Sequence, residues 1–205
     1  MNSVIVSVSI VLLNAFFSSL VAYALAKLRF PGKNILFFIV LAFMMIPFQL
    51  LMVPLFLQIS NLGLIGKYSG IILPSAISSF SIFLLRQALI SLPNDYIEAA
   101  LIDGAHHFRI FFVIIVPMIV PAFVTVMLTN FFWSWNNYVW PMMVSVQHDE
   151  IATMQVAIAR YRTLQDMKWG ATMAACTLTA SPIVIVYLFM QSQFIESVAQ
   201  SGLKG

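Results

Sequence analysis

The sequence has 205 residues, of which 61% are hydrophobic and 8% are charged, with a net charge of +3 and a mean hydropathy of +0.98. Soluble domains carry about 25% charged residues, so these charges could not cover a soluble surface. The composition therefore excludes a soluble enzyme, a disordered tail and a nucleic-acid-binding module, and indicates an integral membrane protein.

Five stretches without Asp, Glu, Lys or Arg predict five transmembrane helices, since a spanning helix needs about 20 apolar residues. We expect them at roughly residues 4–26, 35–59, 68–90, 110–132 and 170–191. These runs are continuously apolar rather than alternating, which favours helices over a barrel. The expected fold is all-α, a polytopic membrane helix bundle that forms one domain over residues 1–205.

The distribution of charge predicts how the chain is oriented. The segment Met1–Ser3 is neutral, whereas Lys27, Arg29 and Lys33 follow the first helix. Short cytoplasmic loops collect positive charge, so we expect the N-terminus outside and this basic loop inside. A signal peptide would carry its positive charge before the apolar run, which is not the pattern here. Alternation then places Gly205 and the loop at about residues 91–109 in the cytoplasm.

The loop at residues 91–109 has the pattern of a short capped helix. Glu98 lies near the positive end of its dipole, and Gly104 can end it by adopting a positive φ. Ala99 and Ala100 have short side chains, which would let the backbone of another protein approach. Such a helix, joined to two spans, can transmit force from a cytoplasmic partner. A capped loop helix without any partner explains the same residues equally well.

This loop resembles the EAA signature of the permease subunits of bacterial ABC importers. Glu98-Ala99-Ala100 is followed after three residues by Gly104, and after nine more by Ile114-x-Val116-Pro117. The family commonly has Leu before the proline, where this chain has Val116. Further stretches resemble the family in the same order: AYALAxxRF at Ala22–Phe30, FLLRQ with LP at Phe83–Gln87 and Leu92–Pro93, SWNxxxWP within Phe131–Pro141, and GxxKG at Ser201–Gly205.

The resemblance points to the carbohydrate-importing branch, and within it to the maltose-type second permease. Members of this type usually have six spans and a cytoplasmic N-terminus, so we expect a type I importer fold that lacks the usual first span. The implied partners are a second permease subunit, two ATPase subunits, an extracytoplasmic solute-binding protein and membrane lipid. The resemblance implies ATPase-coupling roles for Glu98, Ala99, Ala100, Asp103, Gly104 and Pro117.

Polar residues in or beside the apolar runs are candidates for a solute pathway, because burying them in lipid is costly. Tryptophan faces and amide groups suit the C–H surfaces and hydroxyls of sugars. Hydrogen bonding between helices, or anchoring of tryptophan at the membrane interface, would explain the same residues. The candidates are Gln49, Asn130, Trp135, Asn136 and Asn137.

We expect neither a metal site nor a bound cofactor. His106 and His107 are adjacent, and neighbours on a helix point about 100° apart, which does not suit one metal ion. The sequence has no Gly-rich phosphate loop with a lysine, so the chain is not expected to be an enzyme. ATP and Mg²⁺ are expected on the partner subunits.

Three other functions remain open. One is a permease for another solute, such as glycerol 3-phosphate or a polyol. Another is an autonomous secondary transporter or channel, although the span centres lack the paired charges that ion coupling often uses. The last is a fragment that serves only as a scaffold.

Overall fold

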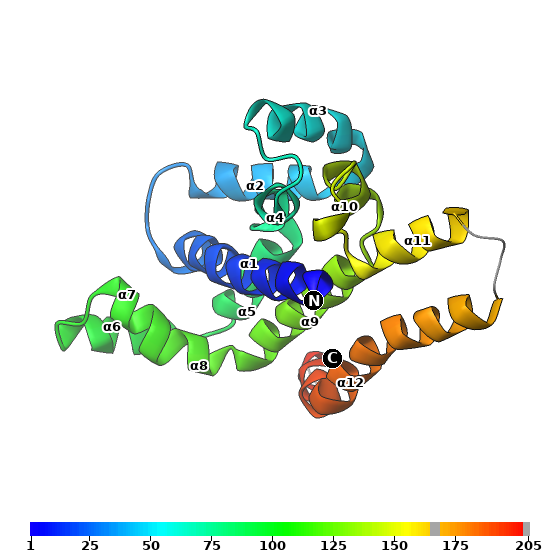
Figure 1. Ribbon diagram of the computed structural model, residues 1–205. Helices are drawn as coiled ribbons and strands as arrows, with labels where there is room; N and C mark the ends of the chain where they lie inside the picture. The colour runs from blue at the N-terminus through cyan, green and yellow to red at the C-terminus, as the bar shows by residue number, and fades with distance from the viewer. Residues whose placement is uncertain (165–168, 203–205) are drawn as a thin grey trace. The chain divides into compact units, whose positions relative to one another are not determined.

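The computed structural model describes the backbone of residues 1–164 and 169–202, and the side chains of residues 1–160 and 169–189 (Figure 1). All regular elements in this part of the chain are helical, which confirms the expected all-α class. Residues 203–205 of the C-terminal GxxKG stretch lie outside the described residues. The elements are α1 (Asn2–Lys27), α2 (Lys33–Met44), α3 (Phe48–Asn61), α4 (Tyr68–Ile72), η1 (Leu73–Ser75), α5 (Ser79–Ile90), α6 (Asp95–Ile102), α7 (His107–Ile110), η2 (Phe111–Ile115), α8 (Val116–Met118), α9 (Val120–Asn136), α10 (Val139–Val144), η3 (Asp149–Ile151), α11 (Met154–Leu164) and α12 (Trp169–Gly202).

Two helices are long and apolar enough to cross a membrane as single elements. They are α1 and the Trp169–Phe189 part of α12. The other three predicted spans are each a broken pair of helices: α2 with α3, α4–η1 with α5, and the helix through α8 with α9. Among the described residues, the number of candidate spans is therefore two, or up to five when each broken pair is one span.

Two of the bends occur beside prolines. Helix α2 cannot continue through Pro47, because a proline has no N–H to extend its hydrogen bonds. Pro47 itself is extended, with ψ of 133°, and precedes α3. Between α8 and α9, Ile119 leaves helical geometry, with φ of −112° and ψ of 21°. The next residue, Val120, precedes Pro121, a position at which helical backbone is disfavoured. These prolines thus break the predicted spans rather than lying inside straight helices.

Contacts divide the chain into two compact units. The first unit comprises residues 1–12, 47–76 and 128–192, and the second comprises residues 13–46, 77–127 and 193–205. Each is described by itself below. The candidate coupling loop belongs to the second unit, and the candidate solute-pathway residues belong to the first.

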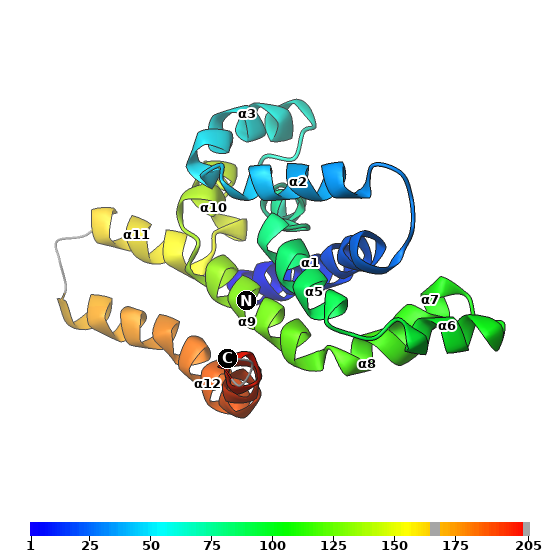
Figure 2. The ribbon, with the colours of Figure 1, turned by 180° about the vertical axis from the view of Figure 1, so that it is seen from behind.

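The second unit has a continuous apolar core that joins α1, α5, α6 and η2. Its fully buried members include Ala22, Leu85, Leu89, Ile110 and Ile115. Helix α2 packs against α5 (Figure 2). In this contact the rings of Phe37 and Phe83 stack with their centroids 6.4 Å apart. The guanidinium of Arg86 lies 3.6 Å from the centroid of the Phe37 ring, a favourable cation–π geometry.

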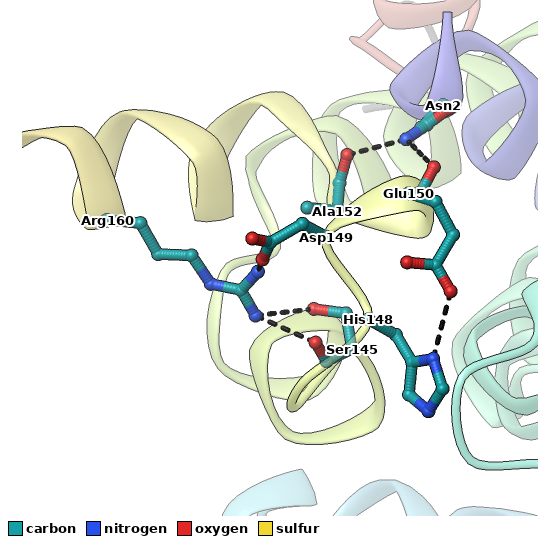
Figure 3. A network of polar contacts seen from close by, with 7 residues as sticks. All are labelled: Asn2, Ser145, His148, Asp149, Glu150, Ala152 and Arg160. Atoms are coloured by element: carbon teal, nitrogen blue, oxygen red, sulfur yellow. Dashed lines mark hydrogen bonds and ion pairs between the residues drawn. The ribbon is translucent and has the colours of Figure 1, made fainter.

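The first unit contains a polar network around the loop that precedes α11 (Figure 3). The Asn2 amide donates to the carbonyls of Glu150, at 2.8 Å, and Ala152, at 2.9 Å. Arg160 donates to the Ser145 carbonyl at 2.8 Å and pairs with Asp149. The Asn2 bonds fix the amino end of α1 to this loop, and the Arg160 bonds join α11 to it.

A carboxylate in the same loop has a perturbed acidity. The pKa of Glu150 is lowered, chiefly by the hydrogen bond from its own backbone N–H and then by the hydrogen bond to His148. The imidazole and carboxylate are 2.9 Å apart and both are exposed, so we assign this pair no stabilising energy.

Close backbone approach in the first unit depends on Gly70 in α4. A β-carbon at this position would overlap the Leu64 carbonyl oxygen and would lie 3.0 Å from Val144 and 3.2 Å from Ile59. Gly66, four residues earlier, donates its N–H to the Val144 carbonyl at 2.9 Å. Both glycines therefore serve packing within the chain.

We predict that Gly70→Ala destabilises the protein by about 1–3 kcal/mol, because the added methyl overpacks a rigid carbonyl contact. Gly170→Ala in α12 is the control, since a β-carbon there would meet nothing within 4 Å. Thermal unfolding in detergent should show a lower midpoint for the first variant and an unchanged or higher one for the second. Equal midpoints for Gly70→Ala and the wild type would show that α4 moves aside without cost.

Candidate functional site

The helix predicted in the loop at residues 91–109 is α6. Asn94 is its N-cap residue, and the Asn94 carbonyl accepts hydrogen bonds from the N–H groups of Ile97, at 2.9 Å, and Glu98, at 3.0 Å. Asp95 and Glu98 both lie in the first turn, where negative charge complements the positive end of the helix dipole. The charge arrangement expected from the sequence is therefore present.

Gly104 ends α6 in a Schellman motif. Its φ is +79°, a backbone conformation that glycine adopts without strain. The Gly104 N–H donates to the Leu101 carbonyl at 3.0 Å, and the Ala105 N–H donates to the Ala100 carbonyl at 3.0 Å. This pair of bonds satisfies carbonyls that would otherwise have no partner at the end of a helix. The prediction that Gly104 stops the helix by a positive φ is confirmed.

The two faces of α6 differ in accessibility. Ile97 and Ala100 are buried in the core of the second unit, whereas Glu98, Ala99 and Asp103 are exposed. The short side chain of Ala100 therefore serves packing inside the chain. The surface that a partner can reach presents the carboxylates of Asp95, Glu98 and Asp103, the small residue Ala99 and the large side chains of Tyr96, Leu101 and Ile102.

Lys27, the last residue of α1, holds the start of this segment. Its ammonium donates to the Leu92 carbonyl at 2.7 Å and to the Asn94 side-chain oxygen at 2.8 Å. From the sequence, Lys27 marked only the cytoplasmic side. Its role at α6 was missed because no local pattern links residues that lie 65 and 67 positions apart.

A second bond from α1 reaches the far end of the same segment. The Tyr23 hydroxyl lies 3.1 Å from Nδ1 of His107, the first residue of α7. Helices α6 and α7 lie next to each other (Figure 1). A cavity of about 610 Å³ lies beside the end of α1 and α6, and its polar lining is Lys27, Arg29, Asn94, Glu98 and His107. Glu98 and Arg29 therefore border the same space.

Two other cations complete the carboxyl end of α1. Lys33 donates to the carbonyls of Ala26, at 2.9 Å, and Leu28, at 3.1 Å. Arg86 donates to the Leu25 carbonyl at 3.3 Å. The last carbonyls of a helix have no partner within the helix and carry the negative end of its dipole, so cations there are favourable.

Pro117, the remaining predicted coupling residue, lies in the short helix α8 beyond the loop, and its side chain is exposed. It follows the π-helical turn η2, whose residues Phe111 and Ile115 are buried. Because Pro117 lacks an N–H, the regular bond to the Val113 carbonyl cannot form. The EAA-like pattern thus ends at a position where helical geometry is already irregular.

The candidate solute-pathway residues occupy different environments in the first unit. Gln49, in the first turn of α3, and Asn136, at the end of α9, are exposed, and Asn137 is half-buried. Asn130 is buried. Trp135 is also buried, and its indole N–H donates to the Thr179 carbonyl of α12 at 3.0 Å. The geometry of Trp135 is that of a helix-packing residue, whereas Gln49 and Asn136 present accessible amides.

Helix α9 carries Asn130, Trp135 and Asn136, whereas Gln49 lies on α3. Aromatic contacts join α3 to α9 and α10. The ring of Phe48, beside Gln49, lies edge-on to Trp133, at 5.8 Å between centroids, and to Trp140, at 6.0 Å. An aromatic cluster of α3, α9 and α10 therefore lies next to the Gln49 amide.

Within the residues that the structure describes, no group of three or more His, Cys, Asp or Glu side chains is arranged to hold a metal ion.

Comparisons with known proteins agree with this architecture. Residues 4–200 match the family described as binding-protein-dependent transport system inner membrane component. The chain is 37% identical over its full length to the arabinooligosaccharides transport system permease protein AraQ of Halalkalibacterium halodurans, covering 73% of that protein. It is 36% identical over its full length to the diacetylchitobiose uptake system permease protein NgcG of Streptomyces coelicolor, covering 68% of it.

Two further matches extend the comparison. The chain is 32% identical over 98% of its length to the sn-glycerol-3-phosphate transport system permease protein UgpE of Yersinia pestis, covering 72% of it. A crystal structure of a bacterial ABC transporter involved in the import of the acidic polysaccharide alginate matches 94% of this chain and 73% of that one, with a TM-score of 0.83 and 27% identity. These findings confirm the resemblance drawn from the EAA-like loop. The chain belongs to the family of inner membrane components of binding-protein-dependent transport systems, and it is a permease subunit of an ABC importer.

Proposed function

We propose that this subunit forms part of the path for a sugar or sugar-like solute, and that its α6 segment couples that path to ATP hydrolysis on partner subunits. The observation that carries the proposal is the capped helix α6, with Glu98, Ala99 and Asp103 exposed on a segment held by α1. The names of the arabinooligosaccharide and diacetylchitobiose relatives support a carbohydrate solute. The glycerol-3-phosphate relative makes that solute the second candidate.

The proposed mechanism is alternating access. ATP, with Mg²⁺, closes a dimer of two ATPase subunits in the cytoplasm. Their closure moves α6 and its counterpart in a second permease subunit, and the path then opens outward to a solute-binding protein. In this scheme the chain performs no covalent chemistry. Exposed groups of α6 contact the ATPase, and exposed amides such as Gln49 contact the solute.

The proposed orientation places the amino end of α1 outside, and α6 and Gly205 in the cytoplasm of a cell whose inner or plasma membrane holds the protein. The support is the basic sequence at the carboxyl end of α1. We predict that Leu62→Cys, in an exposed loop, reacts with an impermeant thiol reagent added outside. Ile102→Cys, 87% exposed in α6, should react only after permeabilisation. Both variants need a Cys176→Ser background, because Cys176 is exposed. The opposite labelling pattern would reverse the orientation.

We predict that Gln49→Ala lowers solute uptake without changing thermal stability, because this amide is exposed. Asn136→Ala should also lower uptake, with only a small change in stability, because the amide is exposed and its bond is to the Phe132 carbonyl of the same helix, at 2.9 Å. The probes are radiolabelled arabinotriose, diacetylchitobiose and glycerol 3-phosphate, each tested on the reconstituted complex. Gln58→Ala, an exposed amide later in α3, is the matched control and should transport normally. Trp135→Phe removes the donor to Thr179 and should instead lower the unfolding midpoint. A lower midpoint for Gln49→Ala would assign that residue to packing.

We predict that Gly104→Val and Glu98→Lys weaken ATPase attachment or abolish stimulated hydrolysis in the reconstituted complex. A β-carbon at Gly104 meets nothing within 4 Å, so the effect of valine comes from the positive φ and from bulk at the partner contact. Backbone strain of this kind is of order 1–3 kcal/mol. Gly104→Ala should be milder than Gly104→Val. Glu98→Lys replaces a favourable charge near the helix amino end with an unfavourable one.

Gly32→Val is the matched control for backbone strain. Gly32 has φ of +81° and open space around a β-carbon, but it lies in the loop between α1 and α2. It should lower stability while leaving stimulated hydrolysis intact. Wild-type hydrolysis and uptake in both Gly104→Val and Glu98→Lys would show that α6 is not the coupling element.

A further inference from the structure

The segment of residues 91–109 is fixed to α1 at two separate points. At its start, Lys27 reaches both the Leu92 carbonyl and the Asn94 side chain, at 2.7 Å and 2.8 Å. At its far end, the Tyr23 hydroxyl lies 3.1 Å from His107 Nδ1. The two α1 residues are one helical turn apart, so they lie on the same face of the helix.

We propose that Tyr23 and Lys27, here termed the α1 clamp, are positioning residues that make the last turns of α1 and the α6 segment move as one body. This inference rests on the coupling role proposed for α6 above. Movement of α6 would then pass directly to α1 through the α1 clamp, in addition to α5 and α7, which the backbone joins to α6.

Apolar packing between the two clamp points supports a rigid connection. Ala22, Tyr23 and Leu25 of α1 share a buried cluster with Ile97 and Ala100 of α6. The ring of Tyr23 is buried and packs against Phe111, with centroids 5.3 Å apart, and this packing fixes the position of its hydroxyl. Two polar contacts on either side of an apolar contact restrict both sliding and rotation of α6 against α1.

The bonding of Lys27 differs from that of its neighbours. Lys33 and Arg86 donate to carbonyls of α1 or of the residue just after it, and so complete the end of that helix. Lys27 donates across to the segment that precedes α6. A lysine that only capped α1 would donate to carbonyls of that helix, whereas the acceptors of Lys27 lie 65 and 67 residues away along the chain.

The first experiment measures hydrogen exchange of the full-length protein in lipid nanodiscs. Lys27→Met should speed amide exchange in residues 91–109 by about tenfold or more, because charge-assisted hydrogen bonds to the segment are lost. Exchange in α10 and α11 should not change, whereas a general loss of stability would raise it there too. Arg29→Met, which removes an exposed cation close to the end of α1, is the charge-matched control and should not affect the segment. Lys27→Arg should restore slow exchange, since arginine keeps the charge and the donors.

The second experiment measures solute uptake per ATP hydrolysed in the reconstituted complex, with the three probes named above. Lys27→Met and Tyr23→Phe should each lower this ratio severalfold while the ATPase still binds. Asn94→Ala should have a smaller effect, because the Leu92 carbonyl still accepts from Lys27. The double variant of Lys27→Met with Asn94→Ala should match Lys27→Met alone.

The outcomes separate this inference from the proposed function. If the wild-type protein recruits no ATPase, the coupling role of α6 fails, while the exchange experiment still decides whether the clamp exists. If the wild type couples normally and Lys27→Met matches Arg29→Met in both exchange and uptake ratio, the clamp is overturned.

Discussion

The last carbonyls of a helix have no N–H donor within the helix, and the bilayer core holds no water that could donate to them. A membrane helix therefore needs other donors at its carboxyl end. In this permease the carboxyl end of α1 meets the requirement with cationic side chains. Lys33 and Arg86 donate to carbonyls between Leu25 and Leu28. Lys27 is the last residue of α1, and its side chain bonds instead to the segment before α6. The placement of α2, α5 and α6 around α1 follows from these bonds and from the core they enclose.

The same requirement explains how the prolines are accommodated. Pro182 cannot donate to the Leu178 carbonyl inside α12, and the Ser181 hydroxyl donates to that carbonyl instead, at 2.8 Å. Where a side-chain donor replaces the missing N–H group, as Ser181 does, α12 continues through its proline. At Pro47 the chain turns instead, and two short helices replace one span.

Features that depend on nearby residues were predictable from the sequence. Stretches without charged residues predicted α1 and α12. Glu98 indicated the amino end of α6 and Gly104 its carboxyl end, since caps and dipole charges act within one turn. The bends could not be predicted, because a membrane helix keeps or loses its course at a proline according to its neighbours in space. The bonds of Lys27 to Asn94 and of Trp135 to Thr179 join residues 67 and 44 positions apart. No periodicity or motif encodes such pairs, so the inward face of Ala100 and the packing role of Trp135 became visible only in the fold.

The bonds at the end of α1 also impose an order on the synthesis of the chain. Lys33 follows Ala26 and Leu28 by only seven and five residues, so these carbonyls acquire their donor almost as soon as the helix is complete. Arg86 comes 61 residues after Leu25, and Leu92 and Asn94 come 65 and 67 residues after Lys27. Until α5 and the start of α6 have been translated, the Lys27 ammonium has neither of these acceptors and must stay in the aqueous boundary. The carboxyl end of α1 therefore reaches its final bonding only when the ribosome has passed residue 94.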